Sequence, residues 1–228
     1  MISLLVPTRN RPEMFARMYN SALETAEGEI ECVMYIDEDD DSYEDTVLPG
    51  LVKVYGPRVV LSRMWNRCYE EASGEYFMHC GDDNIFQTKG WDTKIKEAFP
   101  DDKIAFVHGR DGSPQDNNQF GTHGFLHKNW VDAVGYFVPP YFSCDYNDTW
   151  LNDVSDMIGR HIFVEEVLIE HMHPVWGKRD SDDSDRERIE RGQRDGVKDL
   201  YESKLKERET DAEKLREAVL NAHRYSPW

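Results

Sequence analysis

The chain has 228 residues, of which 39% are hydrophobic, and a formal charge of −18 at pH 7. This size and composition predict one domain with its own core. The negative charge argues against a general nucleic-acid or anionic-lipid binder, because it repels phosphates at long range, and it favours a site for divalent cations. Because no apolar run could span a bilayer and no signal-peptide pattern is present, we expect a cytoplasmic protein.

Strands and helices alternate along the first 110 residues. Short apolar runs predict strands at residues 2–6, 32–36, 51–55, 58–61, 76–80 and 104–108. Amphipathic stretches predict one helix that begins near Pro12 and a second with Ser62 as its N-cap, ending at Gly74. This alternation predicts an α/β fold, a Rossmann-like single domain with a mostly parallel central sheet.

The pattern changes beyond about residue 120. It predicts a strand at 123–127, a helix at 145–158 and strands at 161–164 and 167–169. From Asp180 onward the chain is highly charged with sparse apolar positions, which predicts a charged helical C-terminal extension. We therefore expect a domain at 1–179 that binds its ligand without the extension at 180–228. The extension should pack on the domain through its few apolar side chains, which form a narrow apolar stripe, or pair with a second copy of the chain.

Polar side chains stand at the ends of three predicted strands. They are Thr8 and Arg9, Asp37 and Asp39, and Asp82 and Asp83. In parallel sheets, ligands bind beyond the carboxyl ends of the strands. Carboxylates there bind hard divalent cations and bridge them to diphosphates. Residues 81–84, Gly-Asp-Asp-Asn, are also a good turn sequence, so the acid pair alone leaves a metal site and a simple turn both open.

Two later groups could also carry chemistry. His171 and His173 are two residues apart, so on a strand both would face one ion or one phosphate. Histidines in a loop can equally be surface residues. Asp145 and Asp148 stand at the start of the predicted helix 145–158, where either could cap the helix or act as a general base.

These elements, in this order, resemble the GT-A glycosyltransferase fold, in particular glycosyltransferase family 2 and its phage-encoded relatives. The matching segments are LVPTRNRP (5–12), Asp37, LSRMWN (61–66), EASGEYF (71–77), GDD (81–83), FQTKGWD (86–92), Asn147-Asp148, EHMHP (170–174) and Gly177-Lys178. The resemblance covers roughly residues 1–180. The family's D-x-D metal motif has Gly81 in place of its first acid here, which gives Asp83 the ligand role.

The resemblance implies a metal-dependent enzyme that moves a sugar from a nucleotide-diphosphate sugar, with a UDP-sugar favoured, to an acceptor hydroxyl. The implied donor-binding residues are Pro7, Thr8, Arg9, Asp37, Asp39, Arg63, Asn66, Asp82 and Lys178. Asp83 would hold Mn²⁺ or Mg²⁺ together with His171 or His173. Asp148, with Asp145 as its rival, would be the catalytic base, and attack assisted by that base would invert the anomeric carbon. A retaining mechanism stays open if Asp148 is not placed for in-line attack.

Two other functions stay open on the sequence. A nucleotidyltransferase uses the same carboxylate and metal chemistry, but residues 7–12 contain no glycine for a phosphate loop. A non-catalytic module that binds sugar nucleotides or carbohydrate would need the same pocket without a base. The acceptor could be a saccharide, a protein or a modified nucleobase. If the chain is phage-encoded, its compartment would be the host cytoplasm.

Overall fold

A computed structural model describes residues 1–114 and 119–224 of the chain. Within these residues, eight strands form one sheet in the order β3-β2-β1-β4-β7-β6-β8-β5. The strands are β1 (Ile2–Thr8), β2 (Ile30–Asp37), β3 (Leu51–Gly56), β4 (Tyr76–His79), β5 (Asn84–Phe86), β6 (Phe106–Arg110), β7 (Phe125–His127) and β8 (His161–His171). β1, β2, β3 and β4 run parallel, whereas β7 is antiparallel to both of its neighbours. The predicted α/β class with a mostly parallel sheet is confirmed.

Helices cover both faces of the sheet. They are α1 (Pro12–Thr25), α2 (Leu61–Glu71), α3 (Trp91–Ala98), α4 (Lys128–Val134), α5 (Asn147–Met157), α6 (Asp183–Arg194), α7 (Val197–Ser203) and α8 (Leu205–Arg224), with 3₁₀ turns at Asp41–Tyr43 (η1) and Pro174–Trp176 (η2). The buried side chains of α1 and α3 pack with Leu4 and Val6 of β1. Those of α2, α4 and α5 pack with Leu5, on the opposite face. Alternate residues of the central strand β1 thus join the two halves of the core.

Three local predictions are wrong. Residues 58–60 form no strand, and Leu61 already begins α2. Ser62 does not cap this helix, because its hydroxyl bonds instead to the backbone oxygen of Phe142 and the side chain of Asn147. The two strands predicted at 161–164 and 167–169 are one strand, β8. The predicted break coincides with a register shift, where Val164 and Leu168 pair with successive residues of β6.

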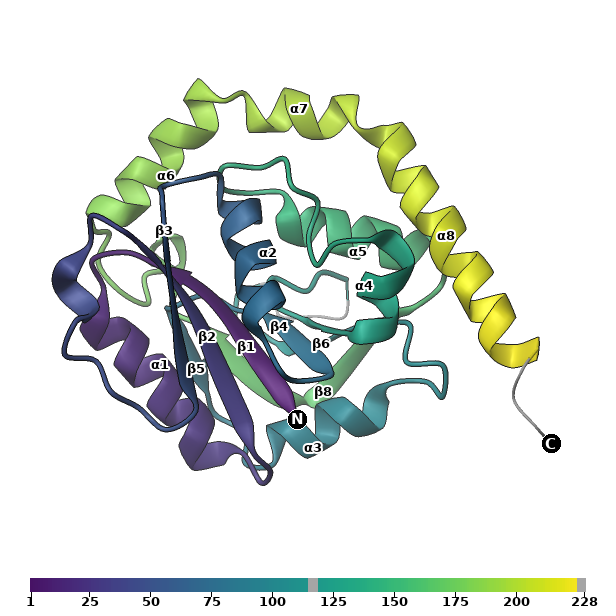
Figure 1. Ribbon diagram of the computed structural model, residues 1–228, viewed down its shortest axis with the longest axis horizontal. Helices are drawn as coiled ribbons and strands as arrows, with labels where there is room; N and C mark the ends of the chain where they lie inside the picture. The colour runs from purple at the N-terminus through teal and green to yellow at the C-terminus, as the bar shows by residue number, and fades with distance from the viewer. Residues whose placement is uncertain (115–118, 225–228) are drawn as a thin grey trace.

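The C-terminal extension packs against the domain. Figure 1 shows α6, α7 and α8 as an arc around one side of it, with α8 beside α4 and α5. Ala212 and Leu215 of α8 are buried in the core on that face and Val197 of α7 is also buried, whereas Ile189 of α6 is 50% exposed. Only part of the apolar stripe is therefore used in docking. Among the described helices, including these three, each is too short or too polar to cross a bilayer.

Candidate functional site

The strand ends predicted to bind a ligand surround one cavity of about 360 Å³. It opens beyond the carboxyl ends of β1, β2 and β4, where the parallel strands stop together. Ten of the residues proposed from the sequence line it: Pro7, Thr8, Arg9, Asp37, Asp82, Asp83, Asp145, Asp148, His171 and His173. The structure thus brings together side chains that are more than 160 residues apart in the chain.

Four proposed donor-binding residues do not line the cavity. Asp39 is exposed and is held by two hydrogen bonds from Arg9, at 2.5 and 2.9 Å. Lys178 forms an ion pair with Glu170, at 2.6 Å. Arg63 lies on the exposed side of α2. A contact from any of these three to a ligand in the cavity would need a change of position.

Asn66, the fourth, is engaged in joining α2 to the segment that follows α4. Its amide nitrogen donates to the backbone oxygens of Ser62 and Val138, and its oxygen accepts from the backbone N–H groups of Phe137 and Val138. Both of its amide hydrogens are therefore used within the protein. The side chain stabilises the packing of α2 and has no donor left for a nucleotide.

Asp82 ends a buried chain of hydrogen bonds. The backbone N–H of Arg11 donates to the hydroxyl of Tyr43, which lies 2.5 Å from the hydroxyl of Thr8, and Thr8 donates to Asp82 at 2.7 Å. The Arg11 guanidinium lies 3.1 Å from the other Asp82 oxygen. Burial raises the pKa of Asp82 to about 6 although Arg11 opposes the shift. Asp82 is thus committed to a fixed arrangement beside Arg11.

Asp83 presents its two oxygens to different partners. Oδ1 lies 3.4 Å from Nε2 of His171, and Oδ2 accepts from Arg179 at 3.2 Å. Burial by itself would raise the pKa of Asp83, but His171, His123 and Arg179 outweigh it and hold the pKa well below its usual range. This carboxyl group is therefore ionised at neutral pH, as a cation ligand must be.

Asp83, His171 and His123 form a group that could hold one cation. One ligand atom of each lies within 4.8 Å of those of the other two. His173 is not part of this group, although its ring lies 5.0 Å from that of His171, and its Nδ1 accepts the backbone N–H of Val175 at 3.2 Å. Sequence reasoning missed His123, which lies just before β7 and was seen only as the start of a strand. No local motif marks it, because its approach to Asp83 depends on tertiary structure.

Asp37 lies between two arginines at the end of β2. Its Oδ2 accepts from Arg9 at 3.0 Å and from Arg58 at 2.6 Å. Its Oδ1 is buried and has no hydrogen-bond partner among the described residues. An unpaired buried carboxylate oxygen is costly unless a ligand completes it. The atom can therefore accept a hydrogen bond from a hydroxyl or N–H group placed in the cavity.

Asp148 and Asp145 lie at the start of α5 in different environments. Tyr146, between them, has a left-handed backbone with φ of 72°, and this turn starts the helix. Burial raises the pKa of Asp148 to about 6, and one of its oxygens accepts the N–H of Thr149 at 2.8 Å. Asp145 is exposed and pairs with Arg188 of α6. Asp148 is the better placed of the two to exchange a proton near neutral pH.

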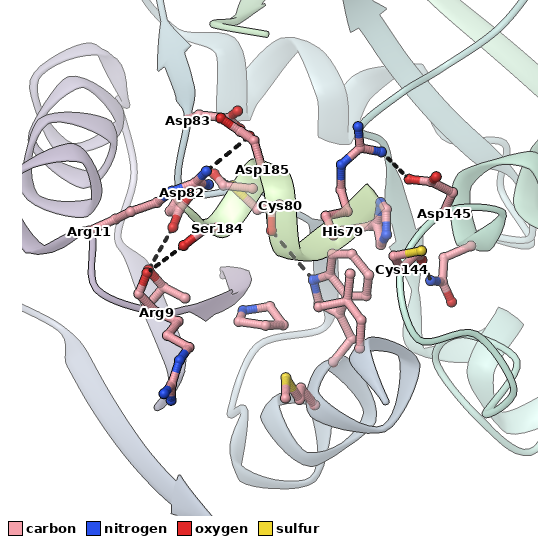
Figure 2. A pocket seen from close by; sticks show the side chains of 18 of the residues that line it. Arg9, Arg11, His79, Cys80, Asp82, Asp83, Cys144, Asp145, Ser184 and Asp185 are labelled. Atoms are coloured by element: carbon pink, nitrogen blue, oxygen red, sulfur yellow. Dashed lines mark hydrogen bonds and ion pairs between the residues drawn. The ribbon is translucent and has the colours of Figure 1, made fainter. Parts of the chain in front are cut away.

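The first turn of α6 closes one side of the cavity. Figure 2 shows Ser184 and Asp185 facing Arg9, Arg11 and the acid pair. Asp185 lies 3.0 Å from Arg11 and 2.5 Å from Arg179, and the Ser184 hydroxyl donates to the backbone oxygen of Arg9 at 3.2 Å. Glu187, Arg188 and Arg191 line the cavity as well. The extension that the sequence places outside the ligand-binding domain thus supplies part of the wall.

The geometry agrees with a comparison of sequence families. A sequence model of Glycosyl transferase family 2 matches residues 3–182, more than three quarters of the chain. The chain belongs to this family. It is therefore a glycosyltransferase, as the motifs at the strand ends predicted. The search of curated proteins returns no match for it.

Solved structures similar to this glycosyltransferase share its fold at low sequence identity. A mannosyltransferase from Pyrobaculum calidifontis, crystallised with GDP-Man and Mn²⁺, is 11% identical with a TM-score of 0.63, over 100% of this chain and 76% of that one. S. aureus TarS is 12% identical with a TM-score of 0.54, over 74% of this chain and 60% of the TarS chain. Other TarS structures contain UDP or UDP-GlcNAc. The GT-A fold is thereby confirmed.

Proposed function

We propose that this glycosyltransferase moves a sugar from a nucleoside diphosphate sugar to an acceptor hydroxyl and needs Mn²⁺ or Mg²⁺ to do so. One observation carries the proposal. An ionised acid beside a histidine (Asp83 and His171), an incompletely bonded acid (Asp37) and a carboxyl group with a pKa near 6 (Asp148) line the same cavity. These are the side chains that a metal, a nucleoside and an acceptor hydroxyl would each require.

The residues at Asp83 fit a divalent cation. Carboxylate oxygen and imidazole nitrogen are both ligands of Mn²⁺, and the nearby ligand atoms lie within 4.8 Å of one another. Bound there, the cation would neutralise the charge that develops on the departing diphosphate. Arg11 lines the same cavity but is paired with Asp82, Asp182 and Asp185, so it would contact the phosphates only if those ion pairs rearranged.

The other end of the cavity suits the nucleoside. The free Oδ1 of Asp37 would accept a hydrogen bond from the ribose or the base, while Arg9 and Arg58 fix its other oxygen. We favour a uridine donor, because TarS, one of the similar structures, was crystallised with UDP and with UDP-GlcNAc. The mannosyltransferase with GDP-Man makes a guanosine donor the alternative to test.

Asp148 supplies the base in this scheme. Its carboxylate takes the proton of the acceptor hydroxyl while that oxygen attacks the anomeric carbon and the bond to the diphosphate oxygen breaks. Attack from the face opposite the leaving group inverts the anomeric configuration. A base with a pKa of about 6 is mostly ionised at pH 7 and still has appreciable proton affinity, which suits this role.

Product analysis tests the proposal. The protein would be incubated with Mn²⁺ and a panel of UDP- and GDP-sugars, and the released nucleotide identified by chromatography. A transferase or its slow donor hydrolysis releases the nucleoside diphosphate. Release of pyrophosphate from a nucleoside triphosphate and a sugar phosphate would instead indicate nucleotidyl transfer. Tight donor binding without turnover, across a wide acceptor panel, would favour a non-catalytic binding module.

We also propose that residues 180–228 are an extension of the transferase domain at 1–179 that completes the cavity wall. The contacts of Asp185 with Arg11 and Arg179 support this role. The apolar side chains of Ile189 in α6 and Leu220 in α8 are exposed, and either could contact a second copy of the chain. Sedimentation velocity of the wild type and of a variant with both residues changed to Ser would test that association.

A further inference from the structure

Gly81 leaves a space that His123 fills. A Cβ atom at Gly81 would lie 2.9 Å from Oδ1 of Asp83, and 3.2 and 3.4 Å from Cε1 and Nε2 of His123. A side chain at position 81 would therefore point at the atoms that surround the metal-ligand group. Because glycine has no side chain, this space is open and the imidazole of His123 can approach Asp83 through it.

The hydrogen bonds of His123 leave a nitrogen free for a cation. Its Nδ1 lies 3.0 Å from the backbone oxygen of His79, and a carbonyl oxygen only accepts, so Nδ1 carries the proton. In the neutral ring, Nε2 then has a free lone pair. This atom is buried and has no hydrogen-bond partner among the described residues. A ring that donates one N–H to a backbone carbonyl and points its other nitrogen at a carboxylate has the usual arrangement of a metal-bound histidine.

Asp83 can accept a cation here without losing Arg179. Its Oδ2 faces Arg179, whereas its Oδ1 faces His171 and the Gly81 space. The arginine and the cation would therefore use different oxygens. The ion pair with Arg179 also keeps the carboxylate from rotating, so Oδ1 stays directed at the two histidines.

We infer that His123 replaces the acid missing at Gly81, so that Asp83, His123 and His171 together hold the cation and select Mn²⁺ and related transition metals over Mg²⁺. This inference rests on the proposed metal dependence and adds the third ligand and the metal preference. A site with two carboxylates suits Mg²⁺ as well as Mn²⁺, because both accept oxygen ligands. Two imidazoles and one carboxylate favour first-row transition metals, since Mg²⁺ binds nitrogen poorly.

Metal binding by the purified full-length protein tests the third ligand. We would titrate Mn²⁺ by calorimetry into wild type, His123→Ala and His223→Ala, and count coupled histidine nitrogens by pulsed EPR. We expect roughly 10- to 100-fold weaker Mn²⁺ binding and one coupled nitrogen in place of two for His123→Ala. His223→Ala is the matched control, because its ring is exposed and remote from the cavity. If His123→Ala does not fold, as judged by circular dichroism, His123→Gln replaces it.

The double variant Gly81→Asp/His123→Ala tests the replacement itself. Removing the imidazole clears the space that the new carboxylate needs. We expect it to recover Mg²⁺ binding relative to His123→Ala and to show a smaller ratio of Mn²⁺ to Mg²⁺ affinity than the wild type. Gly81→Asp alone should bind both ions poorly, because its Cβ would lie 3.2 Å from the retained His123 ring and leave the new carboxylate no space.

The outcomes separate this inference from the proposed function. Two coupled nitrogens and unchanged Mn²⁺ affinity in His123→Ala would overturn the role of His123, while loss of binding in Asp83→Ala would leave the metal site standing. Equal affinity of the wild type for Mn²⁺ and Mg²⁺ would overturn the preference. A wild-type protein that binds neither ion would overturn both the inference and the metal dependence on which it rests.

Discussion

The edge of the sheet and the C-terminal helices contribute to the same cavity in different ways. At the edge, Thr8 and Asp37 are the last residues of buried parallel strands, so the sheet ladder sets their backbone positions. Asp82 lies three residues beyond the end of β4. The extension reaches the cavity as the first turn of α6, whose Asp185 accepts hydrogen bonds from Arg11, from Arg179 and from the backbone N–H of Asp182. The sheet thus fixes the positions of side chains that line the cavity. The extension supplies a carboxylate that pairs with Arg11 and Arg179.

The comparison also concerns stability. The acids of the edge lie at strand ends and contribute little apolar area to the core, whereas α8 buries Ala212 and Leu215 against α4 and α5. Changes at the edge should therefore affect chemistry more than folding. Changes in the extension should affect folding first. The predictions below test this division.

The largest effect is expected from removing the extension after residue 182. Each buried aliphatic side chain contributes about 1.5–3 kcal/mol, and the loss would also expose the face of α4 and α5 that α8 covers. Total stabilities are only about 5–15 kcal/mol. We expect the truncated chain to lose a cooperative thermal transition, measured by circular dichroism. A truncated chain that melts like the wild type and binds the donor equally would show that the domain folds and binds its ligand without the extension, as the sequence predicts.

Two single substitutions test which apolar side chains of the extension contribute to the stability of the fold. Leu215→Ala removes a fully buried side chain and should cost about 2–5 kcal/mol in the free energy of unfolding. Ile189→Ala, at a half-exposed position, should change it by less than about 0.5 kcal/mol. Urea denaturation measures both. Equal changes in the free energy of unfolding for the two variants would mean that α8 does not pack on the domain through Leu215 as the structure shows.

Asp148→Asn tests the edge of the cavity. A base is needed for transfer but not for donor binding, so turnover should fall roughly 10²-fold at unchanged donor affinity. Asp145→Asn is the matched control, because that exposed acid forms a surface ion pair with Arg188 and should lose little activity. Acceptor turnover and donor affinity are measured for both. Near-wild-type turnover in Asp148→Asn would remove this residue from the base role.

The pH dependence of turnover should show the smallest effect. An aspartate of ordinary pKa, near 3.8, would give a constant rate down to about pH 5. Burial raises the pKa of Asp148 to about 6, and the base works only when deprotonated, so the rate should fall about tenfold per unit as pH drops below 6. Turnover at saturating donor and acceptor, measured between about pH 5 and 8, checks this. A flat profile would contradict it.

Much of the fold and the first half of the site follow from local sequence. Buried runs that end in Thr8, Asp37 and Asp82 predict parallel strands, and parallel strands bring their carboxyl ends together. His123 could not be predicted in this way, because it reaches Asp83 only through the pairing of the short strand β7 with β4 and the missing side chain at Gly81.

The extension was hard to predict for a different reason. Its charges suggest a solvated helix, and the sequence does not show which acid faces Arg11 and which faces water. Asp183 and Asp185 are only two residues apart in the same turn, yet Asp183 is exposed and Asp185 pairs with two arginines. Residues two apart in a helix point to nearly opposite faces, and which face of α6 meets the cavity depends on contacts far along the chain.

Donor binding with and without metal tests the central claim most directly. Calorimetry would compare the affinity for the preferred nucleotide sugar in Mn²⁺ and in EDTA, for the wild type and for Asp83→Ala, with melting temperatures as the control for folding. We expect the wild type to bind the donor tightly only with Mn²⁺, and Asp83→Ala to bind at the EDTA level under both conditions with its melting temperature nearly unchanged. A folded Asp83→Ala protein that keeps the full gain from Mn²⁺ would contradict the account.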